Sequence, residues 1–161
     1  MQSIQNLSHT LGQQLLQAQQ VLVTAESCTG GGVASAITDI AGSSQWFDRA
    51  FVTYTNEAKQ EMIGVKAATL DAYGAVSEPV VIEMVQGALN NSHGTVAVSI
   101  SGIAGPGGGS EEKPVGTVCF AWADKSGWLE VSTEHFSGDR AKVRLQAIHH
   151  ALSVISQHLA G

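Results

Sequence analysis

Apolar residues at helical spacing open the chain. Ile4, Leu7, Leu11 and Leu15 recur at intervals of three or four residues, which places them on one face of an α-helix. The pattern predicts a first helix over residues 3–19 that buries this face. The glutamines between the leucines fall on the other face, so this helix is amphipathic.

The pattern then changes from helical spacing to continuous runs. Residues 20–26, QVLVTAE, contain the apolar run Val21-Leu22-Val23, which is typical of a strand buried on both faces of a sheet. A segment rich in glycine and alanine favours a helix over residues 30–40 that packs closely on this sheet. Residues 49–55, RAFVTYT, predict a second strand. A short helix over residues 56–63 follows it directly, with Asn56 as its N-cap.

The middle of the chain continues the alternation of helices and strands. Residues 69–73 predict one helical turn, and a helix over residues 77–89 begins with Ser-Glu-Pro, an N-cap with proline in the first turn. Residues 95–101, TVAVSIS, predict a third strand. Two apolar runs, residues 115–123 and 128–136, are separated by a short polar turn and predict an antiparallel hairpin.

A long helix is expected to end the chain. Ser137 is its predicted N-cap, and Asp139 lies in its first turn, where the helix dipole favours a carboxylate. No repeat, linker or shift in composition divides the sequence. We therefore predict a single domain over residues 1–161, of class α/β, with three layers (α/β/α), a mixed, mostly parallel sheet and a C-terminal antiparallel hairpin.

Two glycine-rich turns mark where a ligand should bind. One follows Glu26 and the other follows Ser101, and both come directly after predicted strands. In open α/β sheets, ligands bind beyond the carboxyl ends of the strands. These two turns are therefore the predicted binding site.

The net charge narrows the class of partner. The chain has 8 Lys and Arg against 14 Asp and Glu, a formal charge of −6. A negative field does not attract nucleic acid or an anionic membrane, so we expect neither as a partner. An anionic substrate would need a local cationic pocket.

Cysteine usage and the N-terminus favour the cytoplasm. Cys28 and Cys119 are the two cysteines, too few for a disulfide framework. The first 20 residues show no charged-then-apolar leader, and no apolar run approaches the roughly 20 residues that a membrane helix needs. We expect a cytoplasmic protein with reduced thiols.

Several common catalytic motifs are absent from the sequence. Neither glycine-rich turn has the lysine of a Walker A loop, and Gly-x-Ser-x-Gly does not occur. The six histidines show no ligand spacing, so we predict no metal site.

A serine at a strand-to-helix corner remains as a candidate nucleophile. Ser27 follows the first strand, and unpaired N–H groups from Thr29 to Gly31 would form an oxyanion or anion site. Serine needs a base. Lys59 lies one turn into the helix after the second strand, with Tyr54 spaced to hold or relay a proton. To act as a base, Lys59 needs a pKa lowered from ~10.4 towards ~7–8.

Each of these residues also has a purely structural interpretation. Ser27 is equally consistent with a helix cap, and Lys59 with a solvated surface residue. Tyr54 in a strand is consistent with packing, and Cys28 with a small buried residue. The motif alone leaves these alternatives open.

Two arginines form a candidate anion site on the last helix. Arg140 and Arg144 are four residues apart and share one helix face. With Ser137 they could hold a phosphate. Surface pairing with Glu134 or Asp139 is the alternative.

Longer motifs carry a family resemblance. TAESCTGG, FVTYTNEAK, GAVSEPV, SGIAGPGGGSEEKPVGTV and FSGDRAKVR occur in this order over residues 24–144. Together they closely resemble the C-terminal domain of the competence/damage-inducible CinA proteins. Thr55 and Ser101 stand where relatives often carry the other small hydroxyl residue, and both swaps keep a hydroxyl.

The resemblance implies a fold, an activity and a set of site residues. It implies a nicotinamide mononucleotide deamidase of pyridine-nucleotide salvage, which releases nicotinate mononucleotide and ammonia without metal or organic cofactor. Ser27 would be the nucleophile, Lys59 its general base and Tyr54 an assisting residue. The residues expected to bind the nucleotide substrate are Thr29, Gly30, Gly31, Asn56, Ser101, Gly102, Gly105 and Arg140.

Two other functions compete with this expectation. One is a non-catalytic module that binds a nucleotide or a partner, in which Ser27 only caps a helix. The other is a thiol-dependent enzyme that uses Cys28. The small domain with its exposed hairpin also favours a homo-oligomer.

Overall fold

The computed structural model describes residues 2–161 as one α/β domain built on a five-stranded sheet. The strand order is β2-β1-β3-β4-β5; β1 pairs in parallel with β2 and β3, and β3-β4 and β4-β5 pair antiparallel. In chain order the elements are α1 (Ile4–Ala18), β1 (Leu22–Glu26), α2 (Gly32–Thr38), a short 3-10 helix (Ser43–Gln45), β2 (Phe47–Val52), α3 (Asn56–Ile63), α4 (Ala67–Tyr73), α5 (Glu78–Asn90), β3 (Val96–Gly102), β4 (Thr117–Asp124), β5 (Leu129–His135) and α6 (Arg140–Ala160).

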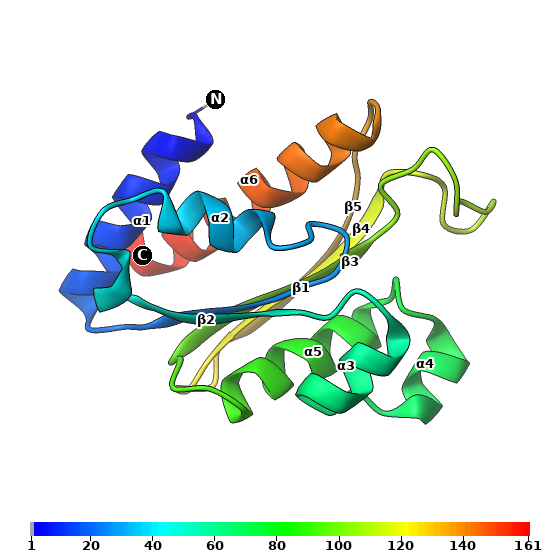
Figure 1. Ribbon diagram of the computed structural model, residues 1–161, viewed down its shortest axis with the longest axis horizontal. Coiled ribbons are helices and arrows are strands. Elements are labelled where there is room, and N and C mark those ends of the chain that lie inside the picture. Colours follow the sequence, from blue (N-terminus) through cyan, green and yellow to red (C-terminus); the bar gives the residue numbers. More distant parts are fainter. Residues whose placement is uncertain (1) are drawn as a thin grey trace.

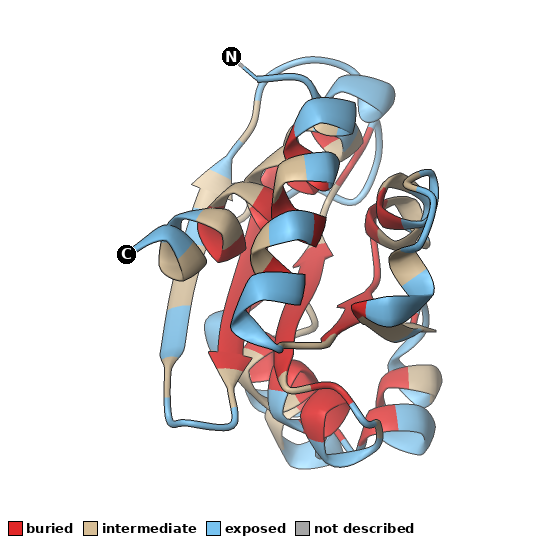
Figure 2. Ribbon diagram, turned by 90° about the vertical axis from the view of Figure 1, so that its left-hand side faces the viewer, coloured by how far each residue is buried: buried red, intermediate tan, exposed pale blue. Residues whose placement is uncertain are grey.

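Helices cover both faces of the sheet. Figure 1 shows α1, α2 and α6 on one face and α3, α4 and α5 on the other. Buried residues run along the inner strands, whereas the outer hairpin strand β5 carries only intermediate and exposed residues (Figure 2). The three-layer α/β/α architecture, the mixed sheet and the antiparallel hairpin predicted from the sequence are confirmed.

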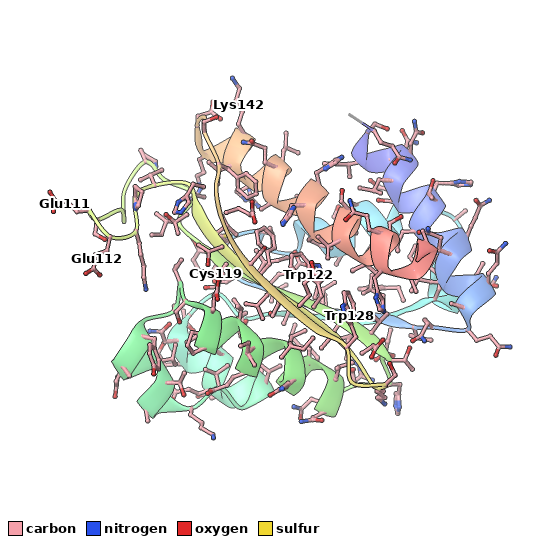
Figure 3. All side chains as sticks on the ribbon, turned by 180° about the vertical axis from the view of Figure 1, so that it is seen from behind. Glu111, Glu112, Cys119, Trp122, Trp128 and Lys142 are labelled. Carbon is pink, nitrogen blue, oxygen red and sulfur yellow. The ribbon has the colours of Figure 1, made fainter. Side chains whose placement is uncertain are left out.

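Each face of the sheet has its own apolar core. Alternate residues of a strand point to opposite faces, so Leu22 packs in the core under α1, α2 and α6, whereas Val23 and Ala25 pack in the core over α5. Trp122 lies in the first core, where its indole N–H donates to the backbone oxygen of Ala151 at 3.0 Å. Figure 3 shows Trp122 against the sheet and Glu111 and Glu112 at the tip of the long loop after β3.

Two predicted helix caps are wrong by one or two residues. Thr55, not Asn56, caps α3, because its side chain accepts a hydrogen bond from the Ala58 N–H at 3.0 Å. Asp139, not Ser137, caps α6, and its carboxylate accepts from the Lys142 N–H at 2.9 Å. Both cap residues have extended backbones, as N-caps require.

Two other boundaries differ from the prediction. Gly30 and Gly31 have φ angles of 57° and 92°, so α2 begins at Gly32 rather than at residue 30. The second strand ends at Val52, so Thr53 and Tyr54 lie in the connection to α3. This shift matters for the site, because the backbone oxygens of Thr53 and Tyr54 are free to bind a side chain.

The three parallel strands end at one edge of the sheet. β1 ends at Glu26, β2 at Val52 and β3 at Gly102, and their register places these ends side by side. The loop over residues 103–116 leaves this edge and extends beyond the body of the domain (Figure 1). None of the helices within residues 2–161 combines the length and apolar character needed to span a bilayer.

Candidate active site

A cavity of about 300 Å³ opens at the carboxyl ends of the parallel strands. Its walls come from the turn after β1, the start of α3, the end of β3, the glycine-rich loop and the start of α6. Eight of the residues predicted from the sequence line it: Ser27, Tyr54, Asn56, Lys59, Ser101, Gly102, Gly105 and Arg140. Thr29, Gly30 and Gly31 lie outside it.

Ser27 and Lys59 meet inside this cavity. The Lys59 Nζ lies 3.1 Å from the Ser27 Oγ, and it donates to the backbone oxygens of Thr53 at 2.9 Å and Tyr54 at 3.3 Å. Lys59 is only 1% exposed and Ser27 is 8% exposed. The serine hydroxyl and the lysine amine therefore form a hydrogen-bonded pair shielded from solvent.

Burial determines the protonation behaviour of Lys59. Its side chain forms no ion pair with a carboxylate within residues 2–161, and its polar neighbours are two carbonyls and one hydroxyl. Removal from water penalises an ammonium ion. Burial therefore lowers the pKa of Lys59 below that of an ordinary lysine.

The three oxygens around Lys59 can accept the three N–H groups of an ammonium, and they also accommodate the neutral amine. A neutral amine has two N–H groups and one lone pair. The two carbonyls of Thr53 and Tyr54 can accept the N–H groups, which leaves the lone pair for the Ser27 hydroxyl proton. This geometry can activate a serine.

Glu26 anchors the turn that carries Ser27. Its carboxylate is fully buried and accepts hydrogen bonds from the side chains of Thr24 at 3.0 Å and Thr29 at 2.8 Å. It also accepts from the N–H groups of Val33 at 2.9 Å and Ala34 at 3.0 Å, at the start of α2. Glu26 therefore binds the end of β1 to the N-terminus of α2.

This role of Glu26 changes the expected anion site. The first N–H groups of a helix are its natural anion-binding donors, but here the protein's own carboxylate occupies two of them. Thr29 is buried and bound to that carboxylate. The geometry gives no support to the prediction that Thr29, Gly30 and Gly31 bind substrate.

Sequence reasoning missed Glu26 as an anchor. The available signal was a carboxylate at the end of a strand whose other residues are apolar or uncharged, with a threonine on either side in Thr24 and Thr29. A buried carboxylate requires several donors, and these threonines supply two of them.

Tyr54 and Arg140 stand together at the mouth of the cavity. Arg140 donates to the Tyr54 hydroxyl at 3.3 Å and to the backbone oxygen of Gly105 at 2.8 Å. Tyr54 is 59% exposed, and its contact with Lys59 runs through its backbone oxygen. The phenol is therefore placed beside a cation at the entrance, which does not support its predicted role as a proton relay.

Arg144 does not share the position of Arg140. Its guanidinium donates to the backbone oxygens of Cys28 at 3.1 Å and Thr29 at 3.0 Å. The structure gives no support to a phosphate site shared by both arginines, because Arg144 binds the turn after Ser27. Arg140 alone lines the cavity.

Cys28 also lines the cavity, but its chemistry differs from that of Ser27. Burial raises the pKa of its thiol to about 11. Only the thiolate is a strong nucleophile, so Cys28 is protonated and unreactive near neutral pH. Within residues 2–161, no group of three or more His, Cys, Asp or Glu side chains is arranged to hold a metal ion.

Comparison with known proteins agrees with this architecture. Residues 4–159 match the family model of the CinA C-terminal domain. The chain is 59% identical over 154 residues to the nicotinamide-nucleotide amidohydrolase PncC of Escherichia coli strain K12, covering 96% of this chain and 93% of that protein. It is 46% identical over 157 residues to PncC of Pseudomonas putida, covering 98% of each.

Solved structures of competence/damage-inducible proteins have the same fold as this chain. The competence/damage inducible protein CihA from Agrobacterium tumefaciens superposes with a TM-score of 0.96 at 41% identity, covering 100% of this chain and 98% of that one. The competence damage-inducible protein A (ComA) from Klebsiella pneumoniae subsp. pneumoniae MGH 78578 superposes with a TM-score of 0.95 at 38% identity, covering 99% and 98%.

Proposed function

Because this chain belongs to the CinA C-terminal domain family, we propose that it hydrolyses the carboxamide of nicotinamide mononucleotide to nicotinate mononucleotide and ammonia. The proposed nucleophile is Ser27 and the proposed general base is Lys59. One observation carries the mechanism: a buried lysine amine 3.1 Å from a serine hydroxyl in a cavity. The choice of substrate rests on the relatives that are named nicotinamide-nucleotide amidohydrolase.

The first half of the reaction would form an acyl-enzyme. Neutral Lys59 takes the proton of Ser27 as the Oγ bonds to the carboxamide carbon, and the carbonyl electron pair moves to oxygen. When the tetrahedral intermediate collapses, the carbon–nitrogen bond breaks and Lys59 returns its proton to the leaving nitrogen. Ammonia departs, and nicotinate mononucleotide stays bound to Ser27 as an ester.

The second half would release the acid. Lys59, neutral again, takes a proton from water as the water oxygen bonds to the ester carbon. Collapse of this intermediate breaks the bond to the Ser27 Oγ, which regains its proton from Lys59. One lysine serves both halves, because the carbonyls of Thr53 and Tyr54 accept hydrogen bonds from its amine in either protonation state.

The entrance of the cavity suits the nucleotide part of the substrate. Arg140 is the guanidinium that lines the cavity, and guanidinium binds phosphate through paired hydrogen bonds. Gly105 and neighbouring glycines let the backbone approach a ligand closely, since they lack a Cβ. We therefore assign the phosphate to Arg140 and propose that Tyr54 keeps the guanidinium in place.

The test is an assay of ammonia release from nicotinamide mononucleotide. The wild type should turn the substrate over, and Ser27→Ala should lose roughly 10⁴-fold or more in kcat. The control is Ser35→Ala, the same change at an exposed position of α2; it should keep full activity. Circular dichroism should show both variants folded.

Two outcomes would overturn the proposal. Full activity of Ser27→Ala would move the nucleophile elsewhere. Tight binding of the nucleotide by the wild type, with no turnover, would identify a binding module instead. Cytoplasmic location and assembly into a homo-oligomer remain predictions from the sequence.

A further inference from the structure

Amide hydrolysis places negative charge on the carbonyl oxygen, and donors must be ready to receive it. Several of the backbone donors near Ser27 are occupied. The Ser27 N–H donates to the Ile100 oxygen at 3.0 Å, and the Gly30 N–H donates to the Ser27 oxygen at 3.0 Å. The N–H groups of Val33 and Ala34 at the start of α2 bind Glu26.

The hydroxyl of Ser101 forms no hydrogen bond within residues 2–161. It lies near the end of β3, is 1% exposed and lines the same cavity as Ser27 and Lys59. Its Oγ is buried and has no hydrogen-bond partner within residues 2–161. A buried hydroxyl without a partner costs about 1–3 kcal/mol, so its presence calls for a reason other than stability.

The sheet places this hydroxyl next to the nucleophile. β1 and β3 are parallel neighbours, with Ala25 opposite Ser99 and Glu26 opposite Ile100. The next pair along this register is Ser27 and Ser101. Neighbouring strands lie about 4.8 Å apart, so the two serines are close neighbours, and both line the same cavity.

Both hydroxyls lie on the same face of the sheet. The side chain of Ser99 donates to the Val81 oxygen of α5, so alternation along the strand puts Ser101 on the face of α3 and α5. Ser27 contacts Lys59 of α3 on that face. Ser101 therefore lies on the strand beside the nucleophile, with its hydroxyl on the same side of the sheet and in the same cavity.

We propose that the Ser101 hydroxyl donates a hydrogen bond to the substrate carbonyl oxygen as Ser27 attacks, and so forms part of the oxyanion hole. This role rests on the proposed amidohydrolase function. It assigns to Ser101 a contact that strengthens as charge develops, so its loss should lower kcat more than it raises KM.

The experiment compares Ser101→Ala and Ser101→Thr with the wild type in ammonia release from nicotinamide mononucleotide. Ser101→Ala should lose about 10²-fold to 10³-fold in kcat, with KM nearly unchanged. Ser101→Thr keeps a hydroxyl and should recover most of the loss. The pH at which activity is half-maximal should not move, because Lys59 remains the base.

Thermal unfolding separates this role from a structural one. Removal of a hydroxyl without a partner should leave the unfolding temperature of Ser101→Ala equal to or above that of the wild type. Wild-type kcat in Ser101→Ala, or equal losses in Ser101→Ala and Ser101→Thr, would overturn the assignment while the wild-type activity stands. No turnover by the wild type would instead refute the function on which the assignment rests.

Discussion

The amine of Lys59 lies 3.1 Å from the hydroxyl of Ser27, and the other two hydrogen-bond partners of that amine are backbone oxygens. The two side chains come from the ends of neighbouring strands β1 and β2, through the turn after one and the short helix after the other. With no carboxylate beside it among residues 2–161, the ammonium form loses its solvation and gains no countercharge. This contact is the basis of the first prediction and its control.

Activity should rise with pH through the pKa of Lys59. Burial lowers this pKa below the ordinary lysine value of about 10.4. Protonated Lys59 cannot accept the serine proton, so activity is lost as the pH falls through the lowered pKa and is retained above it. A pH profile of kcat/KM should show a rising limb with a midpoint clearly below about 10.4.

Lys59→Arg provides the control for that profile. Arginine keeps the positive charge but stays protonated at every accessible pH, so this variant should be inactive throughout. A limb centred at the ordinary lysine value, or activity in Lys59→Arg, would contradict the assignment of the base.

Cys28→Ala should keep most of the wild-type turnover. The pKa of the buried thiol is about 11, so at pH 8 only about 0.1% of it is thiolate. Iodoacetamide should accordingly alkylate Cys28 slowly, which mass spectrometry can follow against a free thiol such as glutathione. Loss of turnover in both Cys28→Ala and Cys28→Ser, with Ser27→Ala still active, would favour a thiol enzyme.

Arg140→Ala should weaken recognition of the phosphate. Loss of a charge-assisted contact costs about 1.5–3 kcal/mol, which corresponds to about 10-fold to 150-fold in kcat/KM for nicotinamide mononucleotide. Nicotinamide riboside, which lacks the phosphate, should lose much less. Steady-state kinetics with both substrates measure the difference.

Lys142→Ala is the matched control for this charge. Lys142 lies in the same turn of α6 but points away from the body of the domain (Figure 3). Its removal should leave both substrates unaffected. Equal losses for the nucleotide and the riboside in Arg140→Ala would argue that Arg140 acts through the Gly105 loop alone.

Glu26→Ala should destabilise the fold. The substitution removes the acceptor for the side chains of Thr24 and Thr29 and for two N–H groups of α2, all held by a fully buried carboxylate. We expect the free energy of unfolding to fall by on the order of 3 kcal/mol in urea denaturation. Glu111→Ala, at the exposed loop tip (Figure 3), should change it by less than about 0.5 kcal/mol. Equal stability of the two variants would contradict the anchoring role.

The fold was largely predictable because its elements follow strong local patterns. The leucines of α1 recur at helical spacing, whereas β1 and the first hairpin strand β4 are short continuous runs typical of buried strands. The helix caps were harder to predict from the sequence. Thr55 and Asn56 are adjacent and both suit an N-cap, so only the backbone geometry decides between them.

The candidate site likewise contains some contacts that the sequence could predict and others that it could not. The proximity of Ser27 and Lys59 could be predicted because each follows a parallel strand, and the carboxyl ends of such strands meet at one edge of the sheet. The role of Arg144 was not predictable, because its partners are the backbone oxygens of Cys28 and Thr29, 116 and 115 residues away. Backbone acceptors have no residue-specific signal in a sequence.

The pleat of β1 makes the site sensitive to changes in strand length. Glu26 and Ser27 are consecutive, yet one faces α2 and the other faces α3. Deletion of a single residue among the first four of β1, residues 22–25, would exchange their directions, sending the carboxylate towards Lys59 and the hydroxyl into the opposite layer. The length of this five-residue strand thus keeps the anchoring carboxylate of Glu26 and the hydroxyl of Ser27 on opposite faces of the sheet.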